Sequence, residues 1–211
     1  MIGQRTETEE LIVKTGSHRF VPAALAAVAF LTASEIGAQT ASLPPRAATT
    51  PAMTPLRDGQ HDFDFLLGKW KFHLRRLQNP LTGSKSWVEF DGTGTCRAIW
   101  NGKALVEEVD FNGPTGRIEG VMVRLYNPQS HQWSLNWANA ANGKFDIPTI
   151  GSFKDGIGEF YDMEPYNGRT ILVRYVWSKT TTSSPHFEQS YSEDGGKTWE
   201  VNWVTDQTRV E

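Results

Sequence analysis

The chain has very little cysteine: Cys96 is the only one among its 211 residues, so no disulfide can form within the molecule. A lone thiol in a stretch of alternating polar and apolar residues is far more often a small core residue than a nucleophile, and no base stands near it in the sequence. We therefore expect Cys96 to fill the core, and we expect packing without a disulfide to stabilise the fold.

An excess of one charge is also absent. The 21 Lys and Arg residues nearly balance the 24 Asp and Glu residues, which leaves a formal net charge of −3, and no basic cluster breaks the balance. A polyanion would gain little electrostatic attraction from such a chain, so nucleic acid is not an expected partner.

Catalytic signatures are lacking as well. The sequence contains no Gly-x-Ser-x-Gly elbow, His-Glu-x-x-His helix, Cys-x-x-Cys pair or phosphate-binding glycine loop. General acid–base chemistry would need paired carboxylates, but the candidates alternate along the chain as solvent-facing charges do. These candidates are Glu107, Glu108, Asp110, Glu159, Asp162 and Glu164. No catalytic residue can be named from the sequence, and whether the protein is an enzyme stays open.

No apolar run is long enough to span a membrane. The longest, residues 20–33, covers 14 residues, whereas a transmembrane helix needs about 20. Lys14 and Arg19 precede this run and small residues follow it up to Ala38, a pattern typical of a cleaved secretory signal peptide. We expect residues 1–38 to be a signal peptide, and the mature protein to be periplasmic or secreted without a membrane span. A permanent membrane helix is the weaker alternative, and acidic residues near the N-terminus leave the true start codon open.

Periodic structure is missing from residues 39–60, which carry four prolines among alanine and threonine. This composition buries too little apolar surface to fold, so we expect a disordered linker. The following stretch, residues 61–211, is long enough to bury a core and is expected to form one domain.

The chain does have many short stretches of alternating polarity, separated by turn residues. Trp70, Phe72 and Leu74 share one face of the first stretch, and Asn101 with Gly102 favours a two-residue hairpin between the second and third. We predict ten strands, at residues 69–75, 87–100, 103–111, 119–126, 132–139, 149–153, 157–164, 170–178, 185–192 and 198–209. Short connections force neighbours to pair antiparallel, and closure of the sheet removes its exposed edges. The predicted fold is all-β, a single antiparallel up-and-down barrel of about eight to ten strands.

A short apolar segment precedes the first strand. Within residues 61–68, Asp62 is placed to cap a helical turn and Gly68 is placed to end it. We therefore predict a short helical plug across one end of the barrel.

Aromatic residues are abundant, and all eight tryptophans lie within the predicted strands or at their ends. Three strands carry them at alternate positions, and each set is predicted to point into the barrel. The sets are Trp133, Leu135 and Trp137; Ile171, Val173, Tyr175 and Trp177; and Trp199, Val201 and Trp203. A filled interior would make them core residues only, whereas an incompletely filled one would form a rigid apolar pocket with indole N–H donors.

Four polar residues alternate with apolar ones and by parity face solvent: Arg124, Arg174, Asn136 and Asn202. The stretches 119–126 and 170–178 are apolar on both faces, however, so either arginine could enter the barrel and bind a carboxylate or a phosphate. The candidate ligand-binding residues of the lumen are Trp70, Arg124, Trp137, Arg174, Tyr175, Trp177 and Trp203.

Residues 192–199 fit the Asp-box pattern Ser-x-Asp-x-Gly-x-x-Trp. In that pattern an Asp carboxylate accepts backbone N–H bonds across a hairpin, and the Trp packs over it. Sialidases carry several copies and this chain has one, so we expect a stabilised hairpin rather than a glycosidase.

Three segments resemble a bacterial exported family of unknown function. The segments are His61–Trp70, Tyr161–Glu164 and Ser192–Trp199 with the following Asn202 and Trp203. The resemblance covers residues 61–210 and implies a lipocalin-like, calycin-type barrel, but it brings no catalytic residues with it.

Some calycin barrels bind haem through one histidine late in the barrel. His186, at the head of the ninth predicted strand, is the only candidate by position, although the neighbouring Pro185 fits an ordinary strand entry equally well. No histidine spacing matches a zinc or haem motif. We therefore expect neither a cofactor nor a metal.

The sequence thus favours an exported barrel that binds a small apolar or amphipathic molecule in an aromatic-lined lumen. Two alternatives stay open. One is a calycin-type enzyme, such as an isomerase, cyclase or hydrolase, that uses the same cavity. The other is a structural envelope protein with a filled barrel. The oligomeric state is not predicted.

Overall fold

The structure confirms the alternation of buried and exposed side chains that the sequence predicts for the first strand. Trp70, Phe72 and Leu74 are buried, and the residues between them are exposed. The computed structural model describes residues 57–210, so the predicted signal peptide and most of the predicted linker lie outside the described residues. Within the described range, no helix has the length and apolar character needed to cross a membrane.

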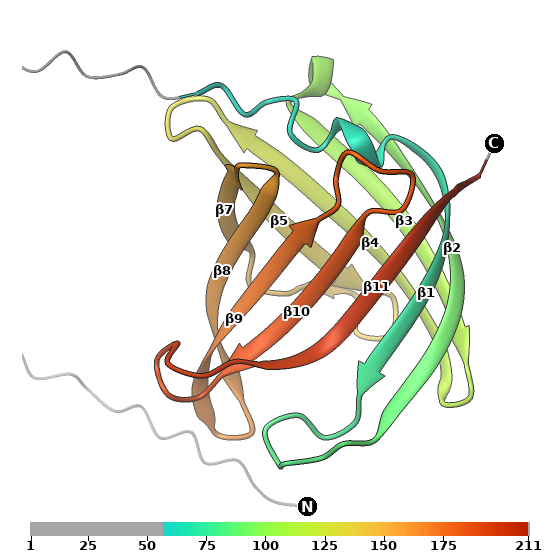
Figure 1. Cartoon of the computed structure of the whole chain (residues 1–211), viewed down its shortest axis with the longest axis vertical. Helices are drawn as coiled ribbons and strands as arrows, with labels where there is room; N and C mark the ends of the chain where they lie inside the picture. The colour runs from blue at the N-terminus through green and yellow to red at the C-terminus, as the bar shows by residue number, and fades with distance from the viewer. Residues whose placement is uncertain (1–56, 211) are drawn as a thin grey trace, which may run out of the picture. The chain divides into compact units, whose positions relative to one another are not determined.

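The described chain is almost entirely β-structure (Figure 1). Its strands are β1 (Gly68–Leu77), β2 (Trp87–Ile99), β3 (Ala104–Gly113), β4 (Gly116–Asn127), β5 (Gln132–Asn139), β6 (Lys144–Phe145), β7 (Thr149–Lys154), β8 (Ile157–Tyr166), β9 (Arg169–Ser178), β10 (His186–Ser192) and β11 (Glu200–Val210). Ten of them form a closed antiparallel ring, in which β4 pairs with β5, β5 with β7, and β11 with β1. The short β6 pairs only with β5.

The predicted fold class and all ten predicted strands are confirmed, and β6 is an addition. The connection between β2 and β3 differs from the prediction. It runs over residues 100–103 and contains the 3-10 turn η2 (Trp100–Gly102), in which Trp100 and Asn101 both have positive φ. The carbonyl of Asn101 accepts a hydrogen bond from Gln60 Nε2 at 3.1 Å. The loop is therefore longer than a two-residue hairpin and contacts the segment that precedes β1.

The predicted helical plug is not present as a helix. Only the 3-10 turn η1 (Asp64–Leu66) forms, and its N-cap residue is Phe63 and not Asp62, whose carboxylate instead accepts a hydrogen bond from Arg57 Nη1 at 2.7 Å. Gly68 begins β1 with a φ of 119° instead of ending a helix. Backbone hydrogen bonds between residues three apart, such as Leu66 N to the carbonyl of Phe63 at 3.0 Å, form consecutive tight turns in this segment instead of a longer helix.

Residues 58–66 nevertheless close one end of the barrel, because they are fastened to it by hydrogen bonds. Trp133 Nε1 donates to the carbonyl of Gly59 at 2.9 Å, and the Tyr126 hydroxyl donates to Asp58 Oδ1 at 2.7 Å. Residues 57–60, the last part of the predicted linker, thus contact the end of the barrel.

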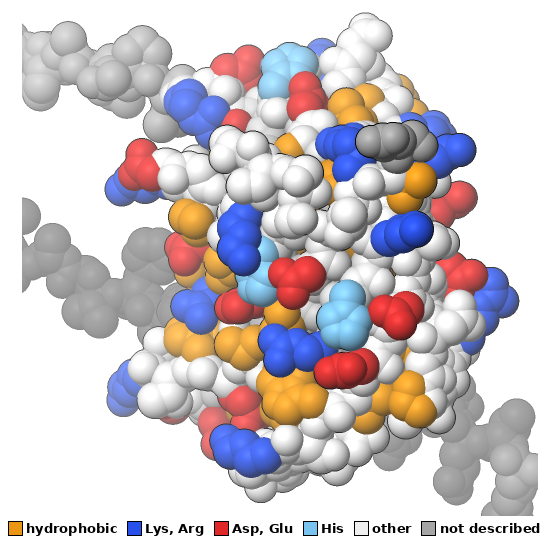
Figure 2. All heavy atoms as spheres, turned by 45° about the vertical axis from the view of Figure 1, so that its right-hand side comes forward, with side chains coloured by type: hydrophobic (Ala, Val, Ile, Leu, Met, Phe, Trp, Pro, Cys, Tyr) orange, Lys and Arg blue, Asp and Glu red, His pale blue; other side chains and the backbone are white. Residues whose placement is uncertain are grey.

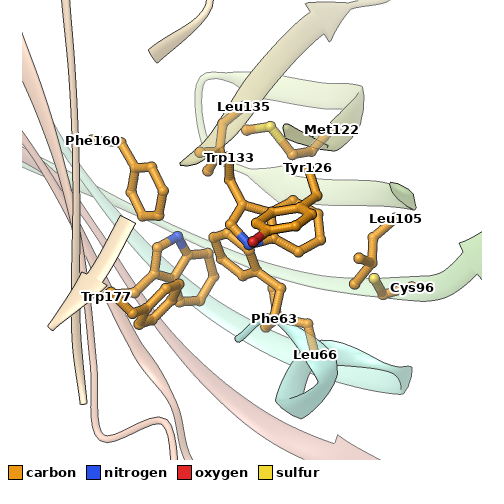
Figure 3. Packing of buried hydrophobic residues seen from close by; sticks show 11 residues of the cluster. Phe63, Leu66, Cys96, Leu105, Met122, Tyr126, Trp133, Leu135, Phe160 and Trp177 are labelled. Carbon is orange, nitrogen blue, oxygen red and sulfur yellow. The ribbon is translucent and has the colours of Figure 1, made fainter. Parts of the chain in front are cut away.

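Phe63 is the centre of this closed end (Figure 3). Its side chain is fully buried, and its ring centroid lies 5.3 Å from that of Trp133, 4.9 Å from that of Phe153 and 5.5 Å from that of Phe160. Aromatic pairs at such distances and tilts add to the free energy of apolar burial. One ring thus joins the segment before β1 to the three neighbouring strands β5, β7 and β8.

The outer surface carries no region dominated by one charge on the face seen in Figure 2. Basic, acidic and histidine side chains are interspersed there, and exposed ion pairs such as Arg117 with Asp110 contribute little to stability. The free energy of folding must come mainly from the barrel interior.

Replacement of Phe63 by alanine is expected to lower the free energy of unfolding by about 3–5 kcal/mol, because it leaves a cavity among aromatic rings that cannot collapse. Denaturant unfolding measures the change. Phe145→Ala serves as the control, since Phe145 is 57% exposed and its loss should change stability by less than about 0.5 kcal/mol. Similar small changes in both variants would contradict this role for Phe63.

Candidate functional site

The half of the barrel opposite Phe63 holds a cavity of about 660 Å³, so the lumen is open rather than packed solid. Aromatic side chains from nearly every strand of the ring line it. They are Phe72, Phe90, Phe111, Trp137, Tyr166, Tyr175, Trp177, Phe187, Tyr191 and Trp203. The cavity opens among the connections that follow β1, β3, β5 and β8, at the end of the barrel away from η1.

The structure brings five of the seven candidate lumen residues together around the cavity. They are Arg124, Trp137, Tyr175, Trp177 and Trp203.

The other two candidates lie elsewhere. The Trp70 indole is buried at the closed end, where its Nε1 donates to the carbonyl of Leu66 at 2.6 Å. Arg174 lies on the outer face of β9, with its guanidinium carbon 4.4 Å from the centroid of the Trp199 ring.

Arg124 and Glu107 form a buried ion pair at the floor of the cavity. Arg124 Nη2 donates to Glu107 Oε2 at 2.7 Å, and the two side chains are only 2% and 5% exposed. Parity predicts that both face solvent, and for both that expectation is wrong. Apolar residues occupy both faces of β3 and β4, so the sequence does not reveal which face turns inward.

Several polar atoms at this floor have no hydrogen-bond partner among the described residues. They are Arg124 Nε and Nη1, Glu107 Oε1 and Trp177 Nε1. The Arg124 guanidinium also faces the rings of Phe63, at 5.1 Å, and Trp177, at 5.6 Å. Buried polar groups in folded proteins are nearly always hydrogen-bonded, so this floor has unused capacity for a polar group.

A β-bulge turns Trp203 toward the cavity. Gln189 pairs with Trp203, but the next residue, Ser190, pairs with Val201, so Asn202 is the extra residue in β11. The bulge shifts the alternation by one position.

The parity predictions for β11 are therefore wrong for three residues. Val201 was predicted to point inward, but it pairs with Ser190, between the cavity-lining Gln189 and Tyr191, and so points outward. Trp199 lies outside the barrel instead of sharing a face with Trp203, and its ring packs near Tyr161. Asn202 is buried and accepts a hydrogen bond from Gln189 Nε2 at 2.8 Å instead of facing solvent. No turn or composition signal in the sequence announces the bulge.

Trp137 lies flat against the opposite wall because its neighbour there has no side chain. A Cβ placed on Gly120 of β4 would overlap the Trp137 ring. Glycine thus leaves room for an indole that borders the cavity.

Carboxylates also lie on the inner side of the barrel; sequence reasoning named Asp162 and Glu164 but placed them toward solvent, and it missed Asp146. Asp162 and Glu164 follow Phe160 on the inner face of β8, and Asp146 precedes β7 at the cavity rim. Burial, together with the charges of Glu164 and Asp146, raises the pKa of Asp162 to about 7. Burial and the charge of Asp146 also raise the pKa of Glu164. The prediction that these two residues of β8 face solvent is wrong, because the inner face of β8 changes from apolar to acidic toward the open end.

His186 does not face the lumen. Its neighbour Phe187 lines the cavity, whereas His186 Nδ1 contacts Asp206 Oδ1 at 2.7 Å and Nε2 contacts Glu188 Oε1 at 3.0 Å on the outer side. Both ring nitrogens are therefore engaged by carboxylates. Among the described residues, no three His, Cys, Asp or Glu side chains gather so as to hold a metal ion.

Cys96 and the Asp-box segment have structural roles, as predicted. Cys96 packs in the core around Phe63, and burial raises the pKa of its thiol to about 12. Asp194 Oδ1 accepts hydrogen bonds from Thr198 N at 2.9 Å and from Ser192 Oγ at 2.8 Å. Trp199 Nε1 closes the same turn by donating to the carbonyl of Gly196 at 3.1 Å.

Comparison with known proteins supports the fold. No family model matches the chain, and no curated protein matches it. Among solved structures, the S-type phycobiliprotein lyase CPES from Guillardia theta is similar, with a TM-score of 0.51 and 11% sequence identity over 74% of this chain and 94% of that chain. At this identity the likeness concerns the fold alone, which is a lipocalin-like barrel.

Removal of one member of the Glu107–Arg124 pair is expected to be costly, because it leaves an uncompensated buried charge. Glu107→Leu and Arg124→Met should each lower the free energy of unfolding by about 3–5 kcal/mol, and the double variant should lose clearly less than the sum. Denaturant unfolding provides the double-mutant cycle, and Glu108→Gln on the exposed outer face is the control. Strict additivity would show that the two groups do not interact.

His186 is expected to make folding stability depend on pH. Burial alone would lower the pKa of its imidazole, but hydrogen bonds with Asp206 and Glu188 outweigh burial and raise it. A raised pKa in the folded state means that the stabilisation is complete below the unfolded value of about 6.5 and is lost as the pH rises through the folded value.

Wild-type protein should therefore exceed His186→Asn in unfolding free energy at about pH 5.5, and this advantage should disappear by about pH 9. Asp206→Asn, which removes the strongest acceptor, should weaken the same dependence. A constant difference across this range would contradict the assignment.

Proposed function

We propose that this barrel, after export to the periplasm or the cell exterior, binds a small, partly apolar molecule in the cavity at its open end. The observation that carries the proposal is the cavity of about 660 Å³, which lies within the range typical of small-molecule sites and has unpartnered polar atoms at its floor.

The floor supports a ligand with a hydrogen-bonding group. Arg124 and Trp177 offer N–H donors, and Glu107 Oε1 offers an acceptor next to them. An unpartnered buried donor or acceptor costs roughly 1–3 kcal/mol, and a bound carbonyl, hydroxyl or amide would recover part of this cost.

The walls support a flat or elongated apolar body. Trp137 and Trp203 come from strands on different sides of the ring, and both border the cavity. Trp137 is backed by Gly120, and Trp203 Nε1 donates to Thr205 Oγ1 at 2.9 Å, so both rings are held in place. Rigid indoles offer a large contact area at a small entropic cost.

An enzyme that uses the same cavity is the second candidate. Asp162, with its pKa raised to about 7 by burial and by neighbouring carboxylates, suits general acid–base catalysis near neutral pH. A lyase of phycobiliproteins has a similar fold, and such barrels serve catalysis as well as carriage. Binding is favoured because Asp162 is not among the residues that line the cavity, whose carboxylates are Glu107, Asp146 and Glu164.

The binding proposal is tested with N-phenylnaphthylamine, a neutral dye whose fluorescence rises in apolar surroundings. Trp137→Ala and Trp203→Ala should each weaken its binding by roughly tenfold, or about 1.4 kcal/mol, because each removes a wall of the cavity. Trp87→Ala is the matched control, since Trp87 lies on the outer face of β2 and is 37% exposed. Unchanged affinity in both lumen variants, with folding intact, would refute the proposal.

A further inference from the structure

The charges that face the lumen are unbalanced. Arg124 is neutralised by Glu107, and the other basic group around the cavity is Arg76 at its rim. Against it stand Asp146 and Glu164, which line the cavity, and Asp162, which precedes Glu164 on the inner face of β8; we call these three carboxylates the acidic wall. None of the three forms an ion pair with another described residue. The lumen therefore carries uncompensated negative charge on one side.

The acidic wall costs stability in the free protein. Asp162 and Glu164 are both partly buried, and Asp162 Oδ1 has no hydrogen-bond partner among the described residues. Carboxylates that lie close together and away from solvent repel one another and lose hydration. Such arrangements tend to persist where function requires them.

The groups packed against the acidic wall offer no compensating cation inside the cavity. Tyr175 from β9 and Tyr191 from β10 face it, and burial raises the pKa of both hydroxyls well above the usual range, so both stay neutral. Tyr166 and Arg76 are the remaining titratable or charged neighbours, and both lie at the rim. The neutral aromatic faces beside the carboxylates are themselves suited to a cation.

Building on the proposed function, we infer that the ligand of this lumen is an organic cation, a protonated amine on an apolar body. Its ammonium group contacts Glu164, next to Asp162 in the acidic wall, and its body lies against Trp137 and Tyr175. An anionic ligand is disfavoured, because it would meet the acidic wall while Arg124 is already paired. A metal ion is disfavoured, because the described acidic side chains do not gather in a metal-binding arrangement.

Three naphthyl compounds of nearly equal shape test the inference: naphthylethylamine, naphthylethanol and naphthylacetate. They are cationic, neutral and anionic near neutral pH. Calorimetry should use the whole barrel domain together with the residues that precede it. At about pH 8 the amine should bind at least about tenfold more tightly than the alcohol. The acetate should bind more weakly than either.

Variants that replace the carboxylates by amides of nearly the same shape show which side chains cause the preference for the amine. Asp162→Asn combined with Glu164→Gln should bring the amine to within about twofold of the alcohol while leaving the affinity for the alcohol unchanged. Because the substitutions remove repulsion, the variant should be at least as stable as wild type. Glu159→Gln on the outer face of β8 is the matched control and should keep the preference for the amine.

A pH series gives a second readout that needs no variant. An alkylamine stays protonated up to about pH 10, so any loss of its advantage at lower pH reports the protein carboxylates. The advantage of the amine should shrink between about pH 8 and pH 5, as Asp162, whose pKa is about 7, becomes protonated in the free protein.

The outcomes separate this inference from the proposed function. Equal binding of amine and alcohol, or tightest binding of the acetate, would overturn the cation inference while the binding function stands. Failure of all three compounds to bind would overturn both. A preference for the amine that survives in the double variant would overturn the role assigned to the acidic wall.

Discussion

Closure of the ring through the pairing of β1 with β11 is the constraint on which the rest of the structure depends. In a closed ring of pleated strands, every second residue of each strand must share one interior. Near β1's first residues that interior is filled by Phe63 and the aromatic residues around it. Toward the other end no segment of residues 57–210 enters it in the same way, and the cavity follows from the same closure.

The alternation of inward and outward side chains along each strand made the barrel predictable. The same alternation made the site only partly predictable. Ten strands and their antiparallel order could be read from alternation and turns, because one face of each strand is apolar. Arg124 was named as a lumen candidate although its parity pointed to solvent, and Glu107 was missed, since apolar residues lie on both faces of β4 and β3. Asn202 was missed because a bulge exchanges the faces of β11, and a bulge leaves no compositional mark. A helix was predicted at the closed end, where only a 3-10 turn forms. The prediction depended on Asp62 and Gly68, which are typical helix-capping residues but have other roles here.

The interior combines two kinds of surface that a purely structural barrel would not need. Indoles and phenyl rings provide rigid apolar walls, whereas Arg124, Glu107 and the acidic wall provide polar groups that the described residues do not fully satisfy. Each unsatisfied group lowers the stability of the free protein. A ligand that is apolar in its body and polar or charged at one end would compensate both, and the account of this protein as a binding barrel depends on that compensation.

The most direct test of ligand binding in the lumen is a two-dimensional NMR titration of the indole N–H signals with N-phenylnaphthylamine. The account predicts shifts for the indoles that border the cavity, which are Trp137, Trp177 and Trp203. It predicts unchanged signals for those outside the lumen, which are Trp87, Trp100 and Trp199. Shifts confined to the outer indoles, or unshifted cavity indoles at saturating ligand, would contradict the claim that the lumen is a ligand chamber.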